Sequence, residues 1–193
     1  MSLAVVLADQ WVKFVVVEEL TSHLDGKRSL GEKLTAFYGK APAQSWDGYH
    51  LRSKRFITVS DSYLRLRYAE NPGAAWGLFR TLPEHIRGPL FDVVSLGAVV
   101  LITRYFLKLK GVPGEGWIRW GLPLVLGGAV GNFVDRLARG FVVDFVEAHW
   151  FDSPTLIWPS FNVADVAICV GVGMLMVDSL VRREKPSPRA AAS

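Results

Sequence analysis

The chain of 193 residues has little cysteine and little histidine, and both shortages restrict its chemistry. The single cysteine, Cys169, excludes an intramolecular disulfide framework and a cysteine-based metal site. The four histidines are scattered, and no two of them stand at the spacing typical of metal ligands. We therefore expect neither a bound metal nor a cofactor.

The N-terminus lacks the features of a cleaved signal peptide. No basic residue precedes the first apolar segment, and Glu18-Glu19 follows it where a small-residue cleavage site would be required. We therefore expect residues 1–17 to be a retained helix, although they include Asp9 and Lys13.

A formal net charge of +4 could suggest a nucleic-acid partner. However, half of the residues are hydrophobic, and they are gathered in long blocks. Basic residues in such a chain are typical of loops that lie beside an anionic membrane leaflet. We expect membrane lipid as a partner and no nucleic acid.

Four apolar segments approach the roughly 20 residues that a helix needs to cross the hydrocarbon core. They are residues 1–17, 90–109, 117–134 and 161–181. Charged side chains near the ends of a span can extend to the membrane surface. The sequence predicts an all-α membrane protein with four transmembrane helices, in a single domain over residues 1–181.

The basic residues of the short connections predict the orientation. The connection between the second and third spans and the tail after the fourth contain Arg104, Lys108, Lys110, Arg119, Arg182, Arg183, Lys185 and Arg189. Cytoplasmic loops carry such an excess of Lys and Arg. We expect both termini in the cytoplasm, residues 18–89 and 137–160 outside, and a disordered basic tail over residues 182–193.

The long outer loop contains a strand-like part at residues 56–79. Leu64, Leu66 and Tyr68 alternate with Arg65 and Arg67, which is the period of a half-buried strand. Asn71-Pro72-Gly73 follows as a turn signal. We expect a small β element on the outer face of the membrane. Residues 21–54 show no clear pattern.

Three polar clusters lie within apolar surroundings, at residues 127–136, 142–145 and 161–165. On a helix, Asn132 and Arg136 share one face, and Gly127 and Gly131 would let a neighbouring helix approach closely. Helix packing, a turn and a helix cap would explain these residues without catalysis.

Asp144 lies in a short β-like run, and Asp165 lies one turn inside the last span, after the capping candidate Asn162. An ionisable residue within a span suggests function. Two carboxylates at the outer end of a bundle could share one proton, so that the ionised one activates water and the neutral one polarises a carbonyl group.

Other functions are compatible with the same residues. In a small proton- or cation-coupled transporter, Asp9 and Asp178 would act with Asp144 and Asp165 as a relay. A serine–lysine peptidase would use Lys13, but no serine is well placed beside it. A non-catalytic scaffold would leave the polar clusters without a purpose.

The polar blocks together resemble a known family. The blocks are Asp9-Gln10 with Lys13, residues 71–77, residues 127–136, Val142-Val143-Asp144-Phe145 and residues 161–165. In this order they resemble lipoprotein signal peptidase, the bacterial signal peptidase II. The resemblance implies an inner-membrane aspartyl endopeptidase, acting as a monomer, with four helices and an extracytoplasmic β-cradle. Its substrates would be diacylated prolipoproteins, cut before the lipidated cysteine.

The resemblance also implies roles for individual residues. The catalytic pair falls on Asp144 and Asp165. Substrate-binding positions fall on Asn71, Gly73, Asn132, Arg136 and Asn162. Asp9 and Lys13 match supporting residues of the first helix, and Asp135 matches a structural residue that we expect to act through its neighbour Arg136.

Overall fold

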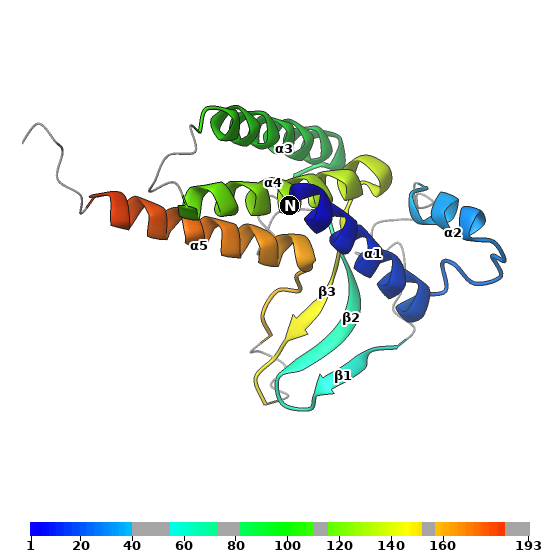
Figure 1. The fold of residues 1–193 in the computed structure, drawn as a ribbon. Coiled ribbons are helices and arrows are strands. Elements are labelled where there is room, and N and C mark those ends of the chain that lie inside the picture. Colours follow the sequence, from blue (N-terminus) through cyan, green and yellow to red (C-terminus); the bar gives the residue numbers. More distant parts are fainter. Residues whose placement is uncertain (40–54, 73–81, 110–115, 152–156, 184–193) are drawn as a thin grey trace, which may run out of the picture.

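The computed structural model describes residues 1–39, 55–72, 82–109, 116–151 and 157–183. Within these residues the elements are α1 (Ser2–Leu20), α2 (Leu30–Phe37), β1 (Ile57–Ser60), β2 (Leu64–Asn71), α3 (Glu84–Leu107), α4 (Gly116–Arg139), β3 (Val142–Ala148) and α5 (Val163–Arg183). Helix α4 packs against α1, α3 and α5, and a small antiparallel sheet projects from one side of the helices (Figure 1). The fold is mostly helical with a small β element, as predicted.

Helix α4 approaches α5 so closely that only glycine fits at the contact. A Cβ atom on Gly128 would overlap the backbone oxygen of Ala164, and one on Gly121 would lie 2.8 Å from the backbone oxygen of Gly171. Because residues late in α4 contact residues early in α5, the two helices are antiparallel. Small residues at helix interfaces permit such close backbone contact in membranes.

An adjacent face of α4 approaches α1 in the same way. A Cβ atom on Gly127 would lie 2.7 Å from the Cβ of Val5, and one on Gly131 would lie 2.7 Å from Oδ2 of Asp9. The prediction that Gly127 and Gly131 allow a close neighbour is therefore confirmed. The contact also brings the Asp9 carboxylate against the backbone of α4.

The three strands form an antiparallel sheet in the order β1-β2-β3. The predicted alternation is confirmed in β2, where Tyr68 is buried and Arg67 is exposed. Strand β3, which follows α4, pairs Ala69 with Asp144 and Asn71 with Val142. The sheet thereby brings two candidate residues, Asn71 and Asp144, to the same place.

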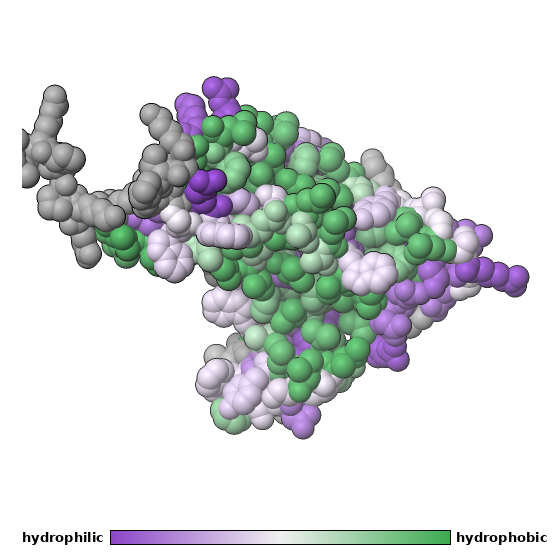
Figure 2. Space-filling model, in the orientation of Figure 1, coloured by the Kyte–Doolittle hydropathy of each residue, from purple (hydrophilic) through white to green (hydrophobic). Residues whose placement is uncertain are grey.

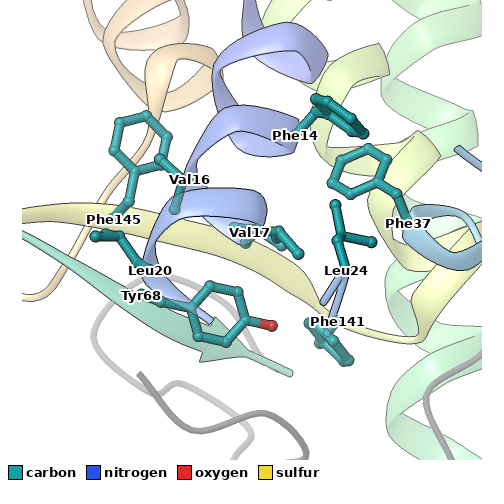
Figure 3. Packing of buried hydrophobic residues seen from close by; sticks show 10 residues of the cluster. Phe14, Val16, Val17, Leu20, Leu24, Phe37, Tyr68, Phe141 and Phe145 are labelled. Carbon is teal, nitrogen blue, oxygen red and sulfur yellow. The ribbon is translucent and has the colours of Figure 1, made fainter. Parts of the chain in front are cut away.

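The main hydrophobic core lies between α1, α2 and the sheet (Figure 3). Phe14 of α1 meets Phe37 of α2 edge-to-face, with ring centroids 5.4 Å apart. Val17 and Leu20 continue the same face of α1 toward Tyr68 of β2. This core fixes the sheet against the C-terminal half of α1.

Helix α2 lies in the region where the sequence showed no pattern. The Ser29 hydroxyl accepts a hydrogen bond from the backbone N–H of Glu32, and the Glu32 carboxylate accepts one from the backbone N–H of Ser29. This reciprocal cap has a recognisable signature, a serine followed three residues later by a glutamate.

Among the described residues, two helical segments are long and apolar enough to cross a membrane, Gly88–Leu107 in α3 and Val163–Val181 in α5. Only 6% of the first and 22% of the second is buried within the protein, unlike the core helix of a soluble protein. Apolar side chains cover most of the helical surface in Figure 2, and hydrophilic ones gather near α2 and at the far end of α3.

Helices α1 and α4, also predicted as spans, do not meet the same criterion, so the four-span arrangement is supported for two helices only. In α1 the charged residues explain the difference, because a hydropathy count treats each charge as exposed. In α1, however, Asp9 and Lys13 are fully buried while Leu3, Leu7 and Trp11 are exposed. The N-terminal half of the helix therefore presents apolar side chains outward.

The close contact between α4 and α5 predicts an asymmetric response to alanine. Gly128→Ala should destabilise the protein by about 1–3 kcal/mol, because the new methyl group overlaps the Ala164 carbonyl. Gly173→Ala is the matched control, since nothing lies within 4 Å of its Cβ position. Thermal unfolding in detergent would measure both, and equal shifts in Tm would contradict the proposed contact.

Candidate active site

The start of α5 is held by a reciprocal cap between Asn162 and Asp165. The Asn162 side-chain oxygen accepts the backbone N–H of Asp165 at 2.9 Å, and the Asp165 carboxylate accepts the backbone N–H of Asn162 at 3.1 Å. The capping role considered for Asn162 is thus present. It leaves the amide nitrogen of Asn162 available for other partners.

That amide nitrogen joins the two candidate carboxylates. It donates to Oδ1 of Asp144 at 2.7 Å and to Oδ1 of Asn132 at 3.1 Å. The amide nitrogen of Asn132 in turn donates to Oδ1 of Asp165 at 2.9 Å. Asn71 of β2 donates to the second oxygen of Asp144 at 3.0 Å. We call these five residues the carboxylate–amide cluster.

The two carboxylates of the cluster have different surroundings. Asp144 is 2% exposed, whereas Asp165 is partly exposed. Burial raises the pKa of Asp144 to about 8, and the negative charge of Asp165 adds to this rise, while the Asn71 hydrogen bond opposes it. Asp144 therefore carries a proton at neutral pH, next to a carboxylate that water can reach.

A buried ion network lies directly behind the cluster. The Lys13 ammonium is 2.7 Å from Oδ2 of Asp9 and 2.9 Å from Oδ2 of Asp135, and all three side chains are fully buried. Lys13 also donates to the Asn132 side-chain oxygen at 3.1 Å. The other oxygen of Asp9 accepts the backbone N–H of Ala164, which links α1 to the start of α5.

Asp135 links the network to the sheet. Its carboxylate accepts hydrogen bonds from Gln10 at 2.8 Å, from the backbone N–H of Val143 at 3.1 Å, and from Arg139. We expected Asp135 to act through Arg136, but its ion-pair partners are Lys13 and Arg139. Arg139 lies one helical turn after Asp135, so the spacing alone could have indicated this pair.

The side chain of Arg136 extends from α4 toward α3. Its guanidinium group is 5.2 Å from the ring centroid of Phe91 in α3, a cation–π distance. It also interacts electrostatically with Asp144 and Asp165. Gly73, the remaining predicted site residue, lies outside the described residues.

Comparison with known proteins identifies the family. A family model described as signal peptidase (SPase) II matches residues 1–181. The chain belongs to the signal peptidase II family. Membership makes the chain a peptidase and confirms the family resemblance seen in the sequence.

Curated relatives carry the name lipoprotein signal peptidase. The protein of Anaeromyxobacter sp. (strain Fw109-5) is 44% identical over 176 residues, which cover 89% of this chain and 79% of that protein. The protein of Halalkalibacterium halodurans is 31% identical over 188 residues, covering 97% of this chain and 94% of the relative.

Solved structures share the fold. A bacterial membrane enzyme determined by the in meso method at 2.3 Å resolution superimposes with a TM-score of 0.65. It is 21% identical, and the match covers 97% of this chain and 89% of that chain. Together with the exposed apolar helices, this likeness supports a membrane protein.

The ion network predicts a strong dependence of stability on Lys13. Lys13→Met should cost about 3–5 kcal/mol, because it leaves the buried carboxylate of Asp9 without a cation and removes one of the two cations that pair with Asp135. The matched control is Lys33→Met, which removes a partly exposed ion pair with Glu18 and should cost about 0–1 kcal/mol. Thermal unfolding in detergent measures the loss of stability in both variants. A loss for Lys13→Met no larger than that for Lys33→Met would contradict the importance of the network.

Proposed function

We propose that this protein is a membrane aspartyl endopeptidase that removes the signal peptide from diacylglyceryl-modified prolipoproteins, cutting before the lipidated cysteine. The observation that carries this proposal is the carboxylate–amide cluster, in which Asp144 of β3 and Asp165 of α5 are joined through two asparagines. The relatives named lipoprotein signal peptidase supply the substrate class.

The different surroundings of the carboxylates suggest their roles. Ionised Asp165, which is partly exposed, takes a proton from a water molecule as that water attacks the scissile carbonyl carbon. Protonated Asp144 donates its proton to the carbonyl oxygen. When the tetrahedral intermediate collapses, the carbon–nitrogen bond breaks, the new cysteine amine takes the proton from Asp165, and Asp144 recovers its own.

The asparagines position the carboxylates in this proposal. The resemblance implied that Asn132 and Asn162 bind substrate, but their amide nitrogens are directed to Asp165 and Asp144. Such neutral donors orient a carboxylate without adding a positive charge that would favour ionisation of both. Arg136 and Gly73 remain the candidates for contact with the peptide backbone or the lipid head group.

The arrangement of the helices supports a site at the outer membrane face. The end of α3, the start of α4 and the end of α5 lie at one end of the helices, and β3 and the start of α5 lie at the other (Figure 1). The positive-inside rule places the first end, with its basic residues, in the cytoplasm. We propose four spans in the bacterial inner membrane, with both termini cytoplasmic.

The sheet also suits the outer surface of the membrane. Tyr63, Trp150 and Phe151 form an exposed cluster of edge-to-face aromatic rings at one end of the sheet. Aromatic side chains of this kind are enriched at the boundary between lipid and water. The cluster could therefore rest on the lipid head groups beside the substrate.

The transporter alternative receives less support from the geometry. Asp9, one of its proposed stations, is paired with Lys13. Asp178 lies thirteen residues after Asp165 on the same helix, or about 20 Å at the helical rise. Proton transfer over that distance would require intervening groups. A serine–lysine mechanism is also disfavoured, because Lys13 contacts Asp9, Asp135 and Asn132 rather than a serine.

Asp144→Asn and Asp165→Asn should each lower kcat/KM by roughly 10³-fold or more, because the two groups act as a unit. For the same reason the double variant should be little worse than either single variant. Purified protein is incubated with diacylated prolipoprotein, and release of the signal peptide is followed on a gel. Asp61→Asn, in the exposed turn between β1 and β2, is the control and should retain activity.

Full activity in either single variant would refute the proposed pair. If the wild-type protein cleaves nothing but moves ions across liposome membranes, the transporter alternative is correct.

The raised pKa of Asp144 predicts an alkaline limit to activity. As pH rises through about 8, the shared proton is lost and both carboxylates become ionised. Above that limit kcat/KM should fall about tenfold per pH unit, because Asp144 can no longer donate a proton. A pH–rate profile in detergent measures this, and a rate that stays constant from neutral pH to well above 8 would contradict the shared proton.

A further inference from the structure

An open groove lies at the end of the bundle opposite the carboxylate–amide cluster. Its volume is about 690 Å³. Helix α4 forms the floor and helices α3 and α5 form the walls, through residues that include Leu101, Tyr105, Ile118, Leu122, Leu175 and Asp178. The described residues that line the groove are mainly apolar, and Asp178 is the acidic one among them.

The groove and the cluster lie on the same side of α4. Leu122 in the groove floor and Arg136 near the carboxylates are fourteen residues apart, close to four full helical turns, so they share one face. Arg136 also contacts Phe91 of α3. The C-terminal part of the same helix, around Leu101 and Tyr105, forms one wall of the groove. A peptide that lay over this face of α4, between α3 and α5, would therefore run from the cluster to the groove.

The length of this path matches a signal peptide. A signal peptide has a basic N-terminal region, then about 7–15 apolar residues, then the cleavage site. As a helix, that apolar region is about 10–23 Å long. Asp178 lies about 20 Å along α5 from Asp165. With its scissile bond at the cluster, a substrate would bring its basic residues to the level of Asp178.

We infer that this groove binds the signal peptide of the substrate, with the Asp178 carboxylate receiving the basic residues of its N-terminal region. The inference rests on the proposed function and extends it to substrate selection. Apolar contacts alone would give little selectivity, since lipid tails are as apolar as the signal peptide. The Asp178 carboxylate, which is only 5% exposed and lies at the membrane boundary, would let the groove distinguish a basic signal peptide from lipid.

The exposed Arg104 and Arg119 lie at the same end of the bundle but do not line the groove. Basic residues at such positions face the anionic head groups of the cytoplasmic leaflet. The end of the bundle thus combines a basic outer surface with an acidic group inside the groove. This distribution would direct a basic peptide segment into the groove rather than along its outside.

Changing the charge at position 178 of the enzyme and at the N-terminus of the signal peptide tests the inference. Three diacylated prolipoproteins would be compared, identical except for basic, neutral or acidic residues at the signal peptide N-terminus. The wild-type protein should show kcat/KM about tenfold higher for the basic than for the neutral substrate, mainly through KM. Asp178→Asn should remove this preference, and Asp178→Lys should favour the acidic substrate. Asp61→Lys, in the exposed β1–β2 turn, should keep the wild-type preference.

Cleavage of all three substrates at equal rates by the wild-type protein would overturn the inference while leaving the proposed function intact. An equal loss on all three substrates in both Asp178 variants would also overturn it, and would indicate that the groove holds lipid or supports the fold. Failure of the wild-type protein to cleave any of them would contradict the proposed function itself, and the inference with it.

Discussion

The buried ammonium group of Lys13 is the interaction on which the rest of the structure depends. Its two carboxylate partners, Asp9 and Asp135, each bind a further backbone N–H, so one ion network connects α1, α4, β3 and α5. Burying such charges costs free energy of desolvation. Removing one member costs more, because the charge left behind is buried and cannot be solvated by water. Glycines at the helix contacts bring the backbones close enough for these short side chains to meet.

The same network positions the candidate active site. Lys13 holds the side-chain oxygen of Asn132, which directs the amide nitrogen of Asn132 toward Asp165. Asn162 uses its oxygen to cap α5 and its nitrogen to reach Asp144. Each asparagine therefore connects a structural requirement with a carboxylate. The fold also buries one carboxylate more deeply than the other. In the proposed mechanism, this difference would make one of two chemically identical groups the acid and the other the base.

Local patterns in the sequence predicted local features of the structure, but they did not predict which distant residues come into contact. The alternation around Tyr68 and the cap at Asn162 depend on neighbours within a few residues. The spacing of Gly127 and Gly131 is also visible locally, although the helix that they contact, α1, is distant in the sequence. The charges of α1 were harder to interpret, because one partner of Lys13, Asp135 of α4, is far away in the sequence. The pairing of β2 with β3, which unites Asn71 and Asp144, likewise joins segments separated by two helices. Helix α2 had a visible capping signature but only a short apolar pattern.

The central claim is that Asp144 and Asp165 share one proton at neutral pH. Infrared difference spectroscopy of protein labelled at its aspartate carboxyl carbons would test it most directly, by comparing wild type with Asp144→Asn. The account predicts a band from a protonated carboxyl group at neutral pH that disappears as pH rises through about 8 and is missing from the variant. If the wild-type and variant proteins show the same protonated-carboxyl signal at neutral pH, the shared proton does not reside on this pair.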